Sequence, residues 1–202
     1  MTRTISLAIV AAAFASTASA AAPAAPAPTM LTLLPEGAVN DTEVLAPVDS
    51  EGQVVASRLT SGDAAFSVRT VSYELVGDNE DCDSGMSHMV RVWKSSALRP
   101  AATPAGVQSY QVPVAPDAGS RTINIDLSQS IRLARGESLF VAVELMQDAD
   151  LGMCLAGVAV APKDQLRQFV STSMAAPFQW SSFDSFGAQV TMDITAYGYK
   201  VR

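Results

Sequence analysis

Alternation of apolar and polar residues is the feature that most limits how this chain can fold. Residues Arg121–Leu127 read RTINIDL, so that Ile123 and Ile125 share one side of the segment with Leu127 and polar residues occupy the other side. The same two-residue period recurs in Ser138–Leu145 (SLFVAVEL). Side chains of a β-strand point alternately to opposite faces, so a period of two predicts strands with one buried face.

Further segments of this kind raise the expected total to about eight to ten strands, separated by Pro-rich and Gly-rich connections. They are Gln53–Leu59, Phe66–Leu75, Ser87–Lys94, Val107–Val114, Cys154–Ala161, Phe169–Ser173, Phe178–Phe183 and Gln189–Val201. Only Pro162–Gln168 favours a helix, of at most two turns. We therefore predict an all-β fold, an antiparallel two-sheet β-sandwich of jelly-roll or related Greek-key type.

Two of these segments change the phase of their alternation. The apolar positions move to the other parity between Val68 and Val71, and again between Ala196 and Tyr197. One extra residue in a strand produces such a change, so both segments are predicted to contain a β-bulge.

The N-terminal segment has the composition of an export signal. Arg3 precedes the apolar stretch Ile5–Ala15, and small residues lead up to Ala20. This pattern predicts a signal peptide over 1–20, then an Ala/Pro linker over 21–29 and a single β-sandwich domain over 30–202. No later apolar run reaches the length of a membrane helix, so we expect an exported protein, extracellular or periplasmic, with no transmembrane segment in the mature chain.

Cys82 and Cys154 are the only cysteines. In an oxidising compartment a single pair favours a structural disulfide. Free or intermolecular thiols, or a chemical role for the sulfur atoms, are the alternatives.

Charge and residue inventory exclude several functions. The formal net charge is −7 and the isoelectric point is near 4.6, so nucleic acid is not an expected partner. His88 is the only histidine, which excludes zinc centres with two or three histidines within one chain, and its strand position favours a structural role. No phosphate-binding glycine loop is present. We expect a protein that is not an enzyme, although a glycosidase built on two carboxylates needs no local motif and stays open.

Acidic residues gather beside both cysteines. Because flexible loops rich in carboxylates supply the hard oxygen ligands of Ca²⁺, a weak calcium site is one hypothesis, and a solvated acidic loop is the other. No other cofactor is expected. The proposed metal ligands are Asp78, Asp81, Asp83, Asp148 and Asp150.

Aromatic residues gather in 178–187. Aromatic rings stack on sugar faces, so Trp180, Phe183 and Phe186, extended by Trp93, form a candidate ligand-binding surface. The alternative is that these rings fill the core.

The expected function is a secreted noncatalytic binding module for a glycan or cell-envelope polymer. The alternative is a structural or adhesive surface protein, or an inhibitor, that acts through contact with another secreted protein.

Overall fold

The computed structural model describes residues 30–33, 42–44, 53–77, 87–113, 119–148, 152–160, 168–187, 190–192 and 194–201. Within them the chain forms thirteen strands, and the helical element is the short 3-10 helix η1 (Phe183–Phe186). The strands are β1 (Met30–Leu33), β2 (Thr42–Val44), β3 (Gln53–Thr60), β4 (Phe66–Gly77), β5 (Ser87–Ser95), β6 (Gln108–Pro113), β7 (Gly119–Leu133), β8 (Ser138–Asp148), β9 (Gly152–Val160), β10 (Gln168–Ser171), β11 (Trp180–Ser182), β12 (Val190–Met192) and β13 (Ile194–Lys200). Every pairing between them is antiparallel, which confirms the predicted all-β class.

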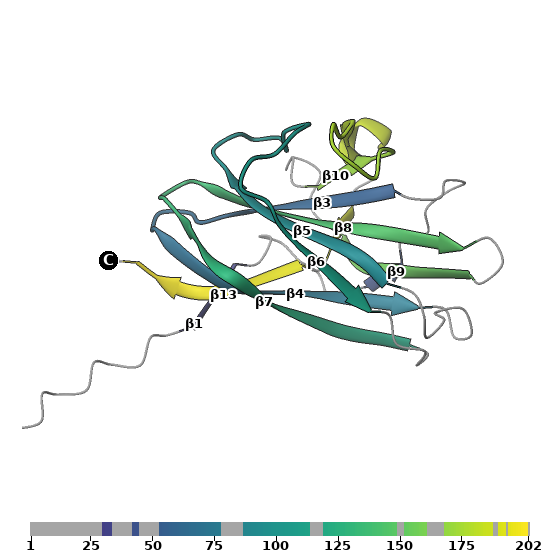
Figure 1. Ribbon diagram of the computed structural model, residues 1–202, viewed down its shortest axis with the longest axis horizontal. Helices are drawn as coiled ribbons and strands as arrows, with labels where there is room; N and C mark the ends of the chain where they lie inside the picture. The colour runs from purple at the N-terminus through teal and green to yellow at the C-terminus, as the bar shows by residue number, and fades with distance from the viewer. Residues whose placement is uncertain are drawn as a thin grey trace, which may run out of the picture.

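The strands form two layers (Figure 1). One layer has the order β1-β13-β4-β7, and the other has the order β6-β5-β8-β3-β10-β11. Strand β9 joins them, because it pairs with β4 in one layer and with β8 in the other. The remainder of β9 pairs with β2 and β12. The result is a β-sandwich whose sheets share a strand at one edge.

The strand registers confirm the bulge predicted in β4, because the consecutive residues Tyr197 and Gly198 of β13 pair with Thr70 and Val68 and leave Arg69 as the extra residue. The bulge predicted in β13 is wrong, since Ile194–Lys200 contains no extra residue in this pairing. The pairing of β4 with β7 shifts between Val68 and Thr70, and the pairing of β13 with β4 shifts between Tyr197 and Gly198. Strands β1 and β2 were not expected, because segments of three or four residues are too short to display a period. In the segment expected to be helical, Gln168 begins strand β10 and residues 161–167 lie outside the described part of the chain.

The main core lies between the two sheets. The core residues that belong to strands come chiefly from alternate positions. In β8, for example, Leu139, Val141 and Val143 all point inward. Phe140 and Ala142 lie between them in the sequence and are equally buried, but they belong to a second cluster on the outer face of the same sheet. The middle of this layer is therefore buried on both faces.

The second cluster, here called the aromatic cluster, contains Trp93, Phe140, Phe169 and Phe178, with the partly buried Trp180 packed against it. The β5–β6 connection and residues 172–187 lie above β3 in Figure 1 and cover this cluster, through Val107 from the first segment and Phe178 and Trp180 from the second. They are tied together by hydrogen bonds from Trp180 Nε1 to the Ala101 carbonyl (3.0 Å) and from the Phe178 amide to the Ala102 carbonyl (2.7 Å).

Among the described residues, no helix is long and apolar enough to span a membrane. The expected signal peptide (1–20) and linker (21–29) lie outside those residues.

Candidate functional site

A groove with a volume of about 470 Å³ runs between β7 and the ends of β5 and β6 that lie near the β5–β6 connection. This volume is within the range of roughly 300–1,000 Å³ that is typical of small-molecule sites. The groove is lined by Lys94, Ala105, Gly106, Gln108, Gln129, Ser130, Ile131 and Arg132. Most of these residues are polar or small, and they come from three separate parts of the chain.

A large bulge in β7 forms one wall of the groove. On β4, Val68 pairs with Ile131 of β7 but Thr70 pairs with Asp126, so residues 127–130 stand opposite Arg69 alone. Backbone groups in such a bulge lose their partners in the neighbouring strand and must find others.

The side chain of Gln108, on β6, provides those partners. Its Oε1 accepts hydrogen bonds from the Gln129 amide (3.2 Å), the Ser128 hydroxyl (2.9 Å) and the Tyr110 hydroxyl (2.6 Å). Its Nε2 donates to the Gln129 carbonyl (2.8 Å), and the Ser128 amide donates to the Tyr110 hydroxyl (2.8 Å). Gln108 therefore bonds the bulge as a neighbouring strand would.

Replacing Gln108 with leucine is expected to lower the free energy of unfolding by about 1–2 kcal/mol, because several hydrogen bonds are lost at once in a partly solvated position. Urea denaturation followed by circular dichroism measures this change. The matched control is Gln111→Leu on the same strand, whose exposed amide donates only to Ser87 (2.6 Å). Its expected effect is within about 0.5 kcal/mol. Equal effects of the two substitutions would contradict the role assigned to Gln108.

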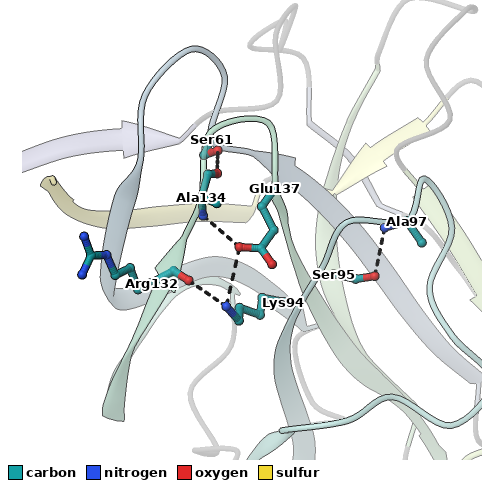
Figure 2. Close-up of polar contacts among 7 residues, drawn as sticks. All are labelled: Ser61, Lys94, Ser95, Ala97, Arg132, Ala134 and Glu137. Carbon is teal, nitrogen blue, oxygen red and sulfur yellow. Dashed lines mark hydrogen bonds and ion pairs between the residues drawn. The ribbon is translucent and has the colours of Figure 1, made fainter. Parts of the chain in front are cut away.

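Lys94, the residue before the last in strand β5, supplies a positive charge to the groove. Its Nζ donates to the Arg132 carbonyl (3.2 Å) and lies 3.6 Å from Glu137 Oε2, as Figure 2 shows. Glu137 Oε2 in turn accepts a hydrogen bond from the Ala134 amide (2.8 Å) in the β7–β8 turn. The Glu137 carboxylate is therefore hydrogen-bonded to the backbone of the β7–β8 turn and forms a longer ion pair with Lys94.

The structure separates the four aromatic residues that the sequence suggested as a ligand-binding surface. Trp93 is 1% exposed and Phe183 is 8% exposed, so neither ring presents a free face to a sugar, and the expectation is corrected for these two residues. Phe186 is 66% exposed and Trp180 is partly buried. Phe183 belongs to the main core and Trp93 to the aromatic cluster.

Arg91 closes one side of the aromatic cluster. Its guanidinium carbon lies 5.7 Å from the centre of the Phe178 ring, a cation–π distance, and its Nη2 lies 3.8 Å from Glu144 Oε1. Glu144 Oε2 accepts a hydrogen bond from the Met89 amide (2.9 Å). The Arg91 guanidinium therefore covers one face of the Phe178 ring.

His88 lies in the main core, where Nε2 is hydrogen-bonded to the Tyr73 hydroxyl and the two rings meet edge to face. Its Nδ1 is buried and has no hydrogen-bond partner among the described residues. Burial lowers the pKa of His88 to about 4 and raises the pKa of Tyr73. Both groups are neutral near pH 7, in line with the structural role expected for this histidine.

The proposed calcium ligands fall mainly outside the described residues. Asp78, Asp81, Asp83 and Asp150 are not described, and of Asp148 only the backbone is, as the end of β8. Within the described part of the chain no cluster of three metal-ligating residues occurs.

Strand pairing shows where the chain enters the two segments that contain the proposed calcium ligands. Cys154 of β9 pairs with Gly77 at the end of β4 and with Met146 near the end of β8. The segments that begin after Gly77 and after Asp148 therefore start from the two strands that flank β9, β4 and β8. Cys82 is outside the described residues, so the disulfide stays a prediction.

Comparison with known proteins yields no match to a protein-family model and none to a curated protein. Among solved structures, the cysteine protease and lectin-like domains of Cwp84, a surface layer associated protein of Clostridium difficile, align with a TM-score of 0.49 at 12% identity, over 75% of this chain and 33% of that one. The clostridial cysteine protease Cwp84 after propeptide cleavage aligns with the same score and identity, over 86% and 40%. This chain spans at most two fifths of those chains, and at this similarity no function is transferred.

Proposed function

We propose that this protein is a secreted, noncatalytic binding module that holds a glycan or another cell-envelope polymer in the groove between β6 and β7. The groove itself is the observation that carries the proposal, because it is a concave surface with both polar and apolar lining, beside a bulge whose Ser128 and Gln129 backbone groups are bonded by side chains of β6. A preformed site of this kind binds with little cost in conformational entropy.

The lining of the groove suits a sugar. Gln129 and Ser130 are exposed and offer amide and hydroxyl groups to ligand hydroxyls, while the exposed Ala105 offers apolar atoms to the C–H face of a ring. Of the described residues that line the groove, none is a carboxylate or a histidine. Acid–base hydrolysis of a glycosidic bond requires such groups, so the chemistry of this lining supports binding rather than catalysis.

Retention on insoluble polysaccharides and binding to a glycan array test this proposal. Ser130→Tyr places a bulky ring in the groove and is expected to reduce retention at least about tenfold, which corresponds to about 1.4 kcal/mol. Ser109→Tyr is the matched control, since Ser109 is an exposed residue of β6 that does not line the groove. Failure of the wild type to bind any glycan, or equal retention of the two variants, would count against the groove as a glycan site.

One observation favours function through protein contact as a second candidate. Leu98 is 65% exposed, Met174 is 44% exposed and Phe186 is 66% exposed, and all three belong to the segments that cover the aromatic cluster. Exposed large apolar residues are typical of contact surfaces when they are contiguous. Concentration-dependent elution in size-exclusion chromatography, abolished by Phe186→Ser, would favour this candidate.

A weak calcium site at the acidic segments is part of the proposal. Millimolar Ca²⁺ is expected to raise the melting temperature by about 3 °C or more relative to EDTA, because an ion that binds only the folded state stabilises it by mass action. Asp81→Asn should remove the difference. Asp63→Asn is the control, since the Asp63 side chain is 97% exposed and pairs with Arg135 (3.1 Å). An unchanged midpoint in wild-type protein would eliminate the site.

A further inference from the structure

We infer that the groove selects a saccharide that carries an isolated carboxylate, such as a uronic acid unit, and that Lys94 is the residue that recognises it. This inference rests on the proposed function and names its class of ligand. It follows from the hydrogen bonding of the ammonium group and from the charges around the groove.

The Lys94 ammonium has N–H groups that can donate hydrogen bonds to a ligand. It has three N–H groups, of which one donates to the Arg132 carbonyl at 3.2 Å. Glu137 Oε2, at 3.6 Å, is beyond direct hydrogen-bond distance and already accepts from the Ala134 amide. The side chain is 52% exposed and lines the groove. Two N–H groups therefore have no hydrogen-bond acceptor among the described residues and can donate to a carboxylate, which would share the ammonium with Glu137.

The charges near the groove favour an anion. Lys94 and Arg132 are the charged residues of its lining, and both are positive, while Glu137, which pairs with Lys94 at 3.6 Å, lies behind the lining. The Arg132 guanidinium extends away from Lys94 (Figure 2), so Lys94 is the cation placed beside the bulge. Because the whole chain carries a net charge of −7, this lining differs in sign from the protein around it.

The same charges set an upper limit on how anionic the ligand is. Phosphate and sulfate clusters are usually bound by several cations or by the two-pronged guanidinium of arginine, whereas lysine acts as a single point charge. A densely charged polymer would also be repelled by the net negative charge of this protein. One ammonium beside the neutral amide of Gln129 matches a single carboxylate on an otherwise neutral sugar.

Isothermal titration of the full chain with three probes tests the inference. The probes are a neutral xylo-oligosaccharide that carries one glucuronic acid unit, the methyl ester of the same oligosaccharide, and a sulfated dextran oligomer. Wild-type protein is expected to bind the acid about tenfold more tightly than the ester and more tightly than the sulfated oligomer. Lys94→Gln should bind acid and ester equally, whereas Lys94→Arg, which retains the charge, should keep most of the preference. Lys200→Gln, at an exposed lysine of β13 outside the groove, is the matched control and should behave as wild type.

The outcomes separate this inference from the proposed function. Equal binding of acid and ester by the wild type overturns the carboxylate selectivity but leaves glycan binding in place. A preference that survives in Lys94→Gln overturns the role of Lys94, and tighter binding of the sulfated oligomer overturns the single-carboxylate match. Lack of binding to all three probes, together with a negative glycan array, overturns both proposals. Circular dichroism of each variant confirms that it is folded.

Discussion

Trp93→Ala is expected to lower the free energy of unfolding by about 3–5 kcal/mol, the usual cost of removing a large aromatic side chain from a core. Trp93 is 1% exposed, its ring stacks on Phe140 with the centroids 5.5 Å apart, and the Trp180 ring lies 6.4 Å away. The cavity left by the indole cannot be filled by a shift of the sheet, because the other face of β5 packs in the main core through Val90 and Val92.

Urea unfolding followed by far-ultraviolet circular dichroism measures the effect. Trp180→Ala is the matched control, because Trp180 is only partly buried and its Nε1 donates to a backbone carbonyl of the β5–β6 connection. We expect this control to cost about half as much as Trp93→Ala. A loss below about 1 kcal/mol for Trp93→Ala would show that the aromatic cluster is not a second core.

Acidification from pH 7 to pH 4 is expected to remove on the order of 3 kcal/mol of stability through His88 alone. Burial lowers its pKa in the folded protein to about 4, whereas the unfolded chain has the ordinary value of 6.5. Between these two values the unfolded state binds more protons than the folded state, so protons favour unfolding. The stabilisation by neutral His88 is therefore complete above about pH 6.5 and is lost progressively as the pH falls to 4.

The test compares wild type with the double variant His88→Phe/Tyr73→Phe across that pH range. Both partners of the buried hydrogen bond are replaced together, so neither polar atom is left unpaired. Because all other titrating groups are retained, the difference in pH dependence between the two proteins isolates His88. Parallel curves from pH 7 to pH 4 would mean that His88 takes up its proton as readily in the folded chain as in the unfolded one.

The two-residue period was sufficient to predict most of the strands and the bulge in β4, because each depends on consecutive residues. Alternation along β5 also puts Trp93 on the face opposite to Val90 and Val92, and the structure has it there. What alternation could not show is whether that face is covered. The cover comes from Ala101 and Ala102 and from the segment near Phe178, which are remote in sequence from each other and carry no periodic signal.

The groove was not predicted, because its parts are also far apart in the sequence. Gln108 and Gln129 belong to different strands, and neither lies in a motif. One local signal was present: the polar run at 128–130 interrupts the apolar series between Leu127 and Ile131. In a regular strand Gln129 would share a face with Ile125 and point into the core, and burying an amide there is so unfavourable that a bulge is the expected solution.

The pairing of strand β9 with both sheets affects how the sandwich opens and how its amide protons exchange. Strand β9 is hydrogen-bonded to β4 on one side and to β8 on the other, so the two sheets of the sandwich are parts of one continuous ladder at that edge. The sheets cannot slide past one another or separate there without breaking backbone hydrogen bonds. Amide protons of β4, β8 and β9 near this seam should therefore exchange together, in a single cooperative opening shared by both layers.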